Sequence, residues 1–342
     1  MEVAILGGGN FGTAIANIVA KNGYPTHLWM RDEQQVADCV AHGENRRYLP
    51  GHPLDSHLTP TADFAEAVAN SSVCFVSVPS TSFREVSEQL ASYTEPRDIL
   101  ISATKGIEAP GFRLMSQILH EVTASKQIGV LSGPNLAEEI ADAQYTGTVI
   151  ASTDDGLCKT VQTLLSSETF RVYESSDVYG VELAGALKNI YAIICGMAAG
   201  LKVGQNTVGM LITRSLAEMS RFAVSLGANP LTFLGLAGVG DLLVTCTSPL
   251  SRNFQLGFRL GEGMTLAEAL ADLGKLAEGV NTLKVVYDRS QELNVYMPLV
   301  AGLYQVIYEK QGIGEVVSSL MANDQAVDVE FAAPSQWDAK FA

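Results

Sequence analysis

The sequence predicts an α/β N-terminal domain with a parallel-dominated sheet, followed by an all-α C-terminal domain. Over residues 1–175, short apolar runs alternate with helical segments, which is typical of a parallel sheet covered by helices on both faces. A glycine-rich turn follows the first apolar run directly. From residue 176 to residue 320 long helical patterns replace the strand pattern. Residues 321–342 show no pattern, and we expect a loosely held tail.

The first strand, expected over Val3–Leu6, runs into a turn with the spacing G-x-G-x-x-G. Gly7 allows a tight turn, Gly9 lets the backbone approach a pyrophosphate, and Gly12 lets the next helix pack close to the sheet. The N-terminus of that helix offers free N–H groups to phosphates. A second strand at residues 25–30 completes a βαβ unit. The pattern therefore predicts a Rossmann-type dinucleotide site rather than a plain glycine turn.

The other elements follow from apolar runs bounded by turn residues. Further strands are expected at residues 73–78, 99–102, 128–131, 148–151 and 170–173, and helices at 33–41, 62–69, 82–93, 112–122, 135–141 and 155–165. Residues 43–60 are expected to form a loop, because Pro50-Gly51-His52-Pro53 interrupts them. In the second domain the expected helices are 178–202, 207–226, 253–261, 265–273, 279–293 and 298–309.

The composition excludes several classes of protein. The formal net charge of −15 argues against nucleic acid or an anionic membrane as a partner, because both attract basic surfaces. An anionic substrate would therefore need a local cationic pocket. The five cysteines contain no C-x-x-C pair, so we expect no structural disulfide, no metal site and a cytoplasmic location. We find no leader and no apolar run long enough to span a bilayer, so no stable membrane insertion is expected.

If a dinucleotide at this site transfers a hydride to a carbonyl group, the reaction also needs a proton donor. Lysines are better candidates for that donor here than histidines. The five histidines lie outside the helical domain and away from the C-terminal ends of the predicted strands, where such sheets bind ligands. Lys105 comes just after a strand, although it could be an ordinary loop lysine. Lys188 lies in an apolar helix, where it is paired, functional or snorkelling at the domain edge. Desolvation and a second ammonium would lower its pKa into a catalytic range.

A third group of residues has the composition of an anion site. Asp241 follows the glycine-rich stretch Gly238-Val239-Gly240, which suits a carboxylate that orients a lysine or accepts a substrate hydroxyl. Ser251, Arg252 and Asn253 open a predicted helix, so N–H groups, a hydroxyl, a guanidinium and an amide converge there. Ser251 alone could simply be an N-cap, but Arg252 beside it favours a phosphate site.

These stretches together resemble bacterial NAD(P)-dependent glycerol-3-phosphate dehydrogenase. The matching stretches are Gly7–Ala14, Trp29–Arg31, Thr104–Glu108, Gly133–Asn135, Glu182–Asn189, Gly238–Asp241, Ser251–Asn253 and Glu278–Gly279. They run in the family's order up to about residue 312. The chain departs from the family at Asn10-Phe11, where Ser-Trp is usual, and at Asn135, where serine or threonine is usual.

The resemblance implies a role for each matching residue. Lys188 would be the proton donor and acceptor, with Lys105 and Asp241 also in the catalytic group. Substrate contacts are implied for Lys105, Gly133, Asn135, Lys188, Asp241, Ser251, Arg252 and Asn253. Cofactor contacts are implied for Gly7, Gly9, Asn10, Phe11, Gly12, Arg31, Lys105, Ala137, Arg252, Leu276 and Glu278.

The implied reaction is reversible reduction of the small molecule dihydroxyacetone phosphate to sn-glycerol 3-phosphate with NADPH or NADH. It would supply glycerophospholipid synthesis in the cytoplasm, and the family leads us to expect a homodimer. Two alternatives remain open. One is another dehydrogenase of the same architecture, such as a 3-hydroxyacid or ketopantoate reductase. The other is a redox-sensing protein that holds a dinucleotide without turnover.

The choice between NADP(H) and NAD(H) depends on Arg31 and Asp32, which end the second predicted strand. An acidic residue there usually binds the ribose 2′-hydroxyl of NAD. The resemblance instead places Arg31 at the ribose, where a guanidinium can pair with a 2′-phosphate. Asp32 could then be the N-cap of the next helix. We therefore predict that NADPH is used at least as well as NADH.

Overall fold

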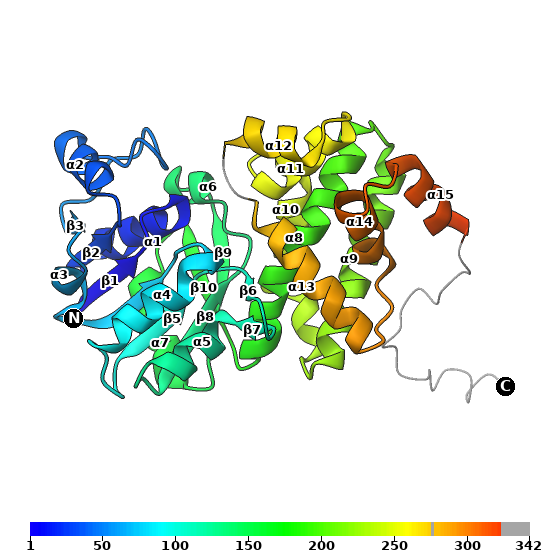
Figure 1. Ribbon diagram of the computed structural model, residues 1–342. Coiled ribbons are helices and arrows are strands. Elements are labelled where there is room, and N and C mark those ends of the chain that lie inside the picture. Colours follow the sequence, from blue (N-terminus) through cyan, green and yellow to red (C-terminus); the bar gives the residue numbers. More distant parts are fainter. Residues whose placement is uncertain (275–276, 323–342) are drawn as a thin grey trace.

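The N-terminal half of the chain is built on an eight-stranded sheet (Figure 1). The computed structural model describes residues 1–274 and 277–322. The strands are β1 (Glu2–Leu6), β2 (Thr26–Trp29), β3 (Leu58–Thr61), β4 (Ser71–Val76), β5 (Ile99–Ser102), β8 (Gln127–Ser132), β9 (Thr146–Ala151) and β10 (Phe170–Ser175). Their order across the sheet is β10-β9-β8-β5-β4-β1-β2-β3. The chain reverses direction across the sheet between β1 and β4, which is the switch point where such sheets bind ligands.

Both faces of the sheet are covered by helices, which explains why its strands are nearly continuous apolar runs. Val3 and Ile5 face a core shared with α1 (Asn10–Lys21), α6 (Ala137–Ala141) and α7 (Asp155–Leu165). Ala4 and Leu6 face a second core shared with α3 (Phe64–Val68), α4 (Ser80–Ala91) and α5 (Met115–Val122). Helix α2 (Glu33–His42) follows β2.

Two features of the sheet were not predicted. Residues 58–60 belong to β3, although the whole stretch 43–60 was expected to be a loop. β3 lies at the edge of the sheet. A proline such as Pro60 is tolerated there, because an edge strand does not need every backbone N–H for pairing. The sheet is parallel-dominated, as expected, but its one antiparallel pair was not located: β9 pairs with β8 in the antiparallel sense, and β10 pairs with β9 in the parallel sense. An apolar run indicates burial but not strand direction. A small hairpin of β6 (Ile107–Glu108) and β7 (Arg113–Leu114) was also missed.

The C-terminal half is helical and packs around one central helix, α8 (Val178–Gly200). The other helices are α9 (Gln205–Ser225), α10 (Asp241–Thr247), α11 (Arg252–Gly261), α12 (Leu266–Leu273), α13 (Glu278–Glu292), α14 (Pro298–Tyr308) and α15 (Ile313–Ala322). A 3₁₀ turn, η1 (Pro230–Leu234), and a π-helical turn, η2 (Leu236–Gly240), precede α10. Helices α10 and α15 were not predicted. The tail prediction falls on residues 321–342, of which 321 and 322 end α15 and 323–342 lie outside the described residues.

Helix α8 corrects the expectation that no segment is long enough to span a membrane. Its 23 residues and mean hydropathy of 1.4 satisfy that test by length and composition. However, 83% of the apolar stretch of this helix is buried inside the protein. The apolar character of α8 is thus explained by its place in the helical core, and it also contains the buried side chains of Glu182 and Lys188.

Candidate active site

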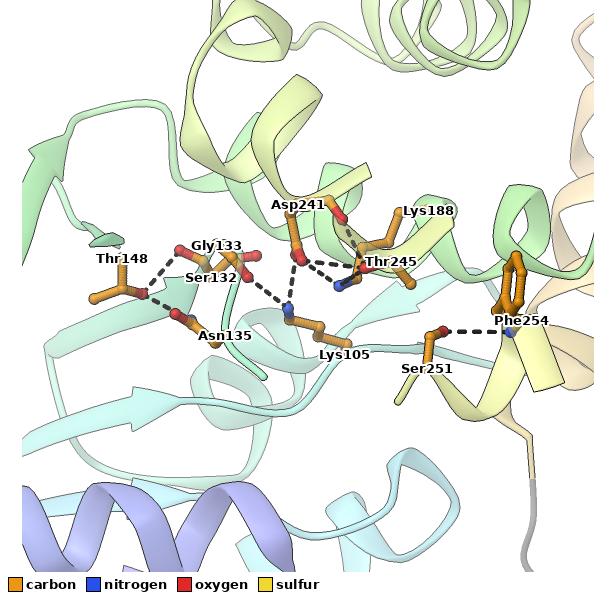
Figure 2. Close-up of polar contacts among 10 residues, drawn as sticks. All are labelled: Lys105, Ser132, Gly133, Asn135, Thr148, Lys188, Asp241, Thr245, Ser251 and Phe254. Atoms are coloured by element: carbon orange, nitrogen blue, oxygen red, sulfur yellow. Dashed lines mark hydrogen bonds and ion pairs between the residues drawn. The ribbon is translucent and has the colours of Figure 1, made fainter. Parts of the chain in front are cut away.

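A buried cluster of two lysines and one aspartate lies where the C-terminal ends of the strands meet the helical half. Lys105 follows β5, and the loop that holds it is fixed by Thr104, whose hydroxyl donates to the carbonyl oxygen of Val78 at 2.7 Å. The Nζ of Lys105 donates to the Gly133 carbonyl oxygen, just after β8, at 3.1 Å and to Oδ2 of Asp241 at 2.7 Å (Figure 2). Neighbouring parallel strands thus bring Lys105 and Gly133 together.

Lys188 reaches the same carboxylate from helix α8. Its Nζ donates to Oδ1 of Asp241 and, at 2.6 Å, to Oγ1 of Thr245 (Figure 2). Asp241 is the first residue of α10, and Thr245 lies one turn later on the same helix face. Lys188 is 6% exposed and Asp241 is 1% exposed. One carboxylate therefore binds both ammonium groups, and that of Lys188 is held away from bulk water.

Burial and the neighbouring charges together shift the pKa of Lys188. Burial lowers the pKa of Lys188 below its ordinary value, and the nearby charge of Lys105 lowers it further, whereas Asp241 raises it. Desolvation is the largest of these effects. The result is an amine that can both hold and release a proton in the neutral pH range, as acid–base catalysis requires.

The predicted anion site at the start of α11 has a defined local structure. Ser251 is the N-cap of that helix, and its Oγ accepts from the Phe254 amide at 3.3 Å (Figure 2), so the N-cap interpretation is confirmed. Oδ1 of Asn253 accepts from the Gly279 amide at 3.0 Å, which joins α11 to α13. Arg252 is exposed. The first turn of α11 thus presents a guanidinium beside the amide groups of a helix N-terminus, an arrangement that favours an anion.

Asn135 lies on the other side of Lys105 and is tied to the sheet (Figure 2). Its Nδ2 donates to Oγ1 of Thr148 at 2.8 Å, and that hydroxyl donates to the Ser132 carbonyl oxygen at 3.1 Å. Oδ1 of Asn135 and Oγ of Ser132 are buried without a hydrogen-bond partner among residues 1–274 and 277–322. Buried polar atoms normally have partners, so the Asn135 oxygen is an acceptor available to a bound small molecule.

The glycine turn after β1 fits the pyrophosphate of a dinucleotide. Gly7 has a φ of +119°, and a Cβ added to it would lie 2.3 Å from the Ser77 carbonyl oxygen. A Cβ on Gly12 would lie 1.9 Å from the Gly7 carbonyl oxygen, so α1 packs directly on the turn. A Cβ on Gly9 would meet nothing within 4 Å. The turn is therefore tightly packed against the protein at Gly7 and Gly12, and it leaves open space at Gly9, beside the N-terminus of α1.

Polar residues that sequence reasoning missed hold this turn from behind. The Gly8 carbonyl oxygen accepts from Nε2 of Gln35 at 2.7 Å and from Nδ2 of Asn45 at 3.0 Å. Asn45 is fully buried and also donates to Oγ1 of Thr13 at 2.8 Å. Thr245 was missed as well, because the helix that carries it was not predicted. Only the i, i+4 spacing from Asp241 could have indicated it.

The other predicted cofactor residues surround the same edge of the sheet. Asn10 and Phe11 are the first residues of α1, and Ala137 is the first residue of α6. Glu278 begins α13, and its Oε1 accepts from the Ser80 amide at the start of α4 at 3.3 Å. Burial raises the pKa of Glu278, while the Ser80 amide and Arg252 oppose that shift. Leu276 lies outside the described residues.

Arg31 and Asp32 have different surroundings. Nη2 of Arg31 donates to Oε2 of Glu85 at 3.1 Å on the surface. Oδ1 of Asp32 accepts from the Gln34 amide at 3.0 Å, and Asp32 is the N-cap of α2. The prediction that Asp32 begins this helix as its N-cap is confirmed.

A Rossmann-type sheet with an open glycine turn, facing a buried lysine–carboxylate cluster, defines a class of protein: dinucleotide-dependent oxidoreductases. Comparisons with known proteins make this specific. The family model for the N-terminus of NAD-dependent glycerol-3-phosphate dehydrogenase matches residues 2–158, and the model for its C-terminus matches residues 177–318. The chain belongs to this family of NAD(P)-dependent glycerol-3-phosphate dehydrogenases.

Individual relatives agree over their whole length. The glycerol-3-phosphate dehydrogenase [NAD(P)+] of Teredinibacter turnerae is 54% identical over 330 residues, which cover 96% of this chain and 97% of the relative. That of Alcanivorax borkumensis is 55% identical and covers 96% of each chain. The crystal structure of the Coxiella burnetii enzyme has a TM-score of 0.90 at 34% identity, and covers 94% of this chain and 99% of its own. The resemblance inferred from the sequence is thus confirmed, as are the enzyme class and the NAD(P) cofactor.

Proposed function

We propose that this enzyme reversibly reduces dihydroxyacetone phosphate to sn-glycerol 3-phosphate, with Lys188 as proton donor and acceptor. The observation that carries the assignment of Lys188 is its position: a buried ammonium held by Asp241 and Thr245 at the ligand-binding edge of the sheet. The nicotinamide cofactor, when bound, supplies the hydride in one direction and accepts it in the other.

Lys188 holds its proton at Nζ, within reach of a carbonyl oxygen placed over the cluster. As that oxygen gains negative charge, the ammonium donates the proton to it, and the neutral amine takes it back in the reverse direction. The lowered pKa makes both forms accessible near neutral pH. Lys105 adds a second positive charge that polarises the carbonyl group. Asp241 orients both amines through its two oxygens.

The substrate phosphate is assigned to the first turn of α11. Its support is the convergence of the Arg252 guanidinium, the Ser251 cap and the side chain of Asn253, which a bond to Gly279 orients. On the other side of Lys105, Gly133 and Asn135 complete the substrate pocket. The orphaned Oδ1 of Asn135 supports that assignment, because a substrate hydroxyl would satisfy it.

The cofactor is assigned to the glycine turn and the residues around it. Gly7, Gly9 and Gly12 form the pyrophosphate cradle, with Asn10 and Phe11 at its rim. Arg31 lies at the adenosine ribose, and Ala137, Lys105, Arg252 and Glu278 lie toward the nicotinamide. Leu276 is included on the family resemblance alone. We assign the dinucleotide-binding domain to residues 1–175 and the substrate domain to residues 176–320.

Replacement of Lys188 tests the central assignment. Lys188→Ala should abolish turnover of dihydroxyacetone phosphate, measured by loss of nicotinamide absorbance, while cofactor binding measured by calorimetry persists. Lys284→Ala is the matched control, because Lys284 is a surface lysine paired with Asp288 at 2.9 Å. Near-normal turnover in the Lys188 variant would remove Lys188 from the mechanism.

The same assay separates the alternatives. A screen of carboxylate substrates against dihydroxyacetone phosphate distinguishes this function from a 3-hydroxyacid or ketopantoate reductase. The cationic first turn of α11 supports a phosphorylated substrate.

The cellular setting is inferred from the proposed reaction. Glycerophospholipid synthesis would consume its product, and the absence of disulfides among the five cysteines agrees with a cytoplasmic location. We also infer a homodimer, which sedimentation at several protein concentrations would test. A monomer at micromolar concentration would contradict it.

A further inference from the structure

The carboxylate that would normally select NAD is already occupied in this protein. Oδ1 of Asp32 accepts from the amides of Gln34 and Gln35, at 3.0 and 3.4 Å. Oδ2 accepts from Nη1 of Arg47 at 2.8 Å. An acidic residue in this place commonly binds the ribose 2′-hydroxyl of NAD. Here one oxygen caps a helix and the other is paired with a guanidinium.

Arg47 is held at this place by the loop that follows α2. Asn45, two residues earlier, is fully buried and donates to the Gly8 carbonyl oxygen at 3.0 Å. The loop is therefore anchored to the glycine turn itself. The Arg47 guanidinium also lies 5.4 Å from the ring centre of Tyr48, which restricts its orientation. The position of Arg47 beside the end of β2 is thus a consequence of the loop's anchorage.

Two guanidiniums flank the end of β2, and both remain accessible. The side chains of Arg31 and Arg47 are each 59% exposed, although each contacts a carboxylate, Glu85 and Asp32 respectively. Surface pairs of this kind contribute little stability by themselves, so an incoming dianion can recruit both cations at low cost. An unpaired Asp32, by contrast, would repel a phosphate there.

We propose that Arg47 is a specificity-determining residue for NADP(H). It binds the 2′-phosphate together with Arg31, and it neutralises Asp32 so that this carboxylate neither repels the phosphate nor serves as the reader of an NAD ribose. The inference rests on the proposed cofactor site. Arg47 would thus distinguish NADP(H) from NAD(H), two cofactors that differ only in the 2′-phosphate.

The test measures the dissociation constants of NADPH and NADH by titration calorimetry, without substrate. Arg47→Ala should weaken NADPH binding at least about tenfold, the usual effect of losing a charged hydrogen bond. NADH binding should change less than about twofold or become tighter. Arg46→Ala is the matched control, because this neighbouring arginine pairs with Asp38 instead. Equal losses for both cofactors, or the same loss in the Arg46 variant, would overturn the proposal.

A second variant separates charge neutralisation from direct contact. Asp32→Asn keeps a good helix cap but removes the negative charge. Introduced into the Arg47→Ala background, it should restore part of the lost NADPH affinity. If it restores none and Arg31→Ala also leaves the NADPH-to-NADH ratio unchanged, the phosphate does not bind here. Turnover is not read in these experiments, so failure of the proposed reaction would leave their result unaffected.

Discussion

At the scale of single residues, the site depends on one buried carboxylate shared by two ammonium groups. Asp241 accepts from Lys105 through Oδ2 and from Lys188 through Oδ1. Burial favours the neutral form of an amine, and the single charge of Asp241 offsets that effect only in part, so one of the two amines is driven toward its neutral form. That amine is Lys188, the more buried of the two lysines. The lowered pKa of Lys188 is thus set chiefly by its burial, with the charge of Lys105 adding to the shift and Asp241 opposing it.

A prediction at this scale concerns the substrate phosphate. Arg252→Ala should raise the KM for dihydroxyacetone phosphate about tenfold or more, because a charge-assisted bond to a dianion is lost. Steady-state kinetics at saturating cofactor measure it. Arg259→Ala is the control on the same helix, since Arg259 lies in the last turn of α11 and pairs with Asp272 of α12. An unchanged KM in the Arg252 variant would place the phosphate elsewhere.

At the scale of elements, the site is positioned by the close crossing of α8 and α11. Gly257 on α11 lies against α8, where an added Cβ would be 1.9 Å from the Ile193 carbonyl oxygen. Gly196 on α8 meets the Phe254 carbonyl oxygen in the same way, at 2.1 Å. This backbone contact holds the first turn of α11 against residues 193–196 of α8, which follow Lys188 on the same helix. Neither helix could approach so closely with larger residues.

The crossing can be tested with one methyl group. Gly257→Ala should lower the free energy of unfolding by about 1–3 kcal/mol, because the helices must separate to admit the Cβ. Urea denaturation measures this change, and the KM for dihydroxyacetone phosphate should rise with it. Gly209→Ala in α9 is the control, because its Cβ would meet nothing within 4 Å. That substitution should be neutral or slightly stabilising, as alanine favours a helix. Equal stability of the two variants would contradict a tight crossing.

At the scale of the whole molecule, a buried glutamate joins the two halves. Oε1 of Glu182 on α8 accepts from the Ser116 amide at 2.9 Å, and Oε2 accepts from the Ser116 hydroxyl at 2.5 Å. Ser116 lies in the first turn of α5, on the sheet. Burial raises the pKa of Glu182 to about 7, against the opposing effect of these bonds. The connection between the halves therefore contains a group that titrates near neutral pH.

This raised pKa makes the stability of the protein depend on pH in a defined direction. Between the unfolded pKa of about 4.3 and the folded value of about 7, the folded state binds more protons at Glu182, so its contribution to stability falls as pH rises. Glu182→Gln removes this dependence. The variant should gain up to about 4 kcal/mol relative to the parent between pH 4 and pH 8, because one pKa unit corresponds to about 1.4 kcal/mol.

Chemical denaturation across that pH range measures the gain. Glu88→Gln, on an exposed position of α4, is the control and should show no such trend. A stability difference between Glu182→Gln and the parent that stays constant with pH would show that Glu182 does not titrate in this window.

Features that depend on local pattern can be predicted from the amino-acid sequence alone. The strand and glycine turn at Val3–Gly12, the position of Lys105 after a strand and the apolar helix around Lys188 are all readable from neighbours in the chain. The same holds for Asp32 and Ser251 as helix caps, since a cap bonds to amides two or three residues away.

Which of these residues come into contact depends on the tertiary fold. Lys105 and Asp241 are 136 residues apart, and their ion pair forms only because the sheet and the helical half pack together. Thr245 beside Lys188, Arg47 beside Asp32 and the antiparallel direction of β9 have no local signature either. Such contacts depend on how elements distant in sequence are docked. Periodicity reports which face of an element is buried, but not what that face is buried against.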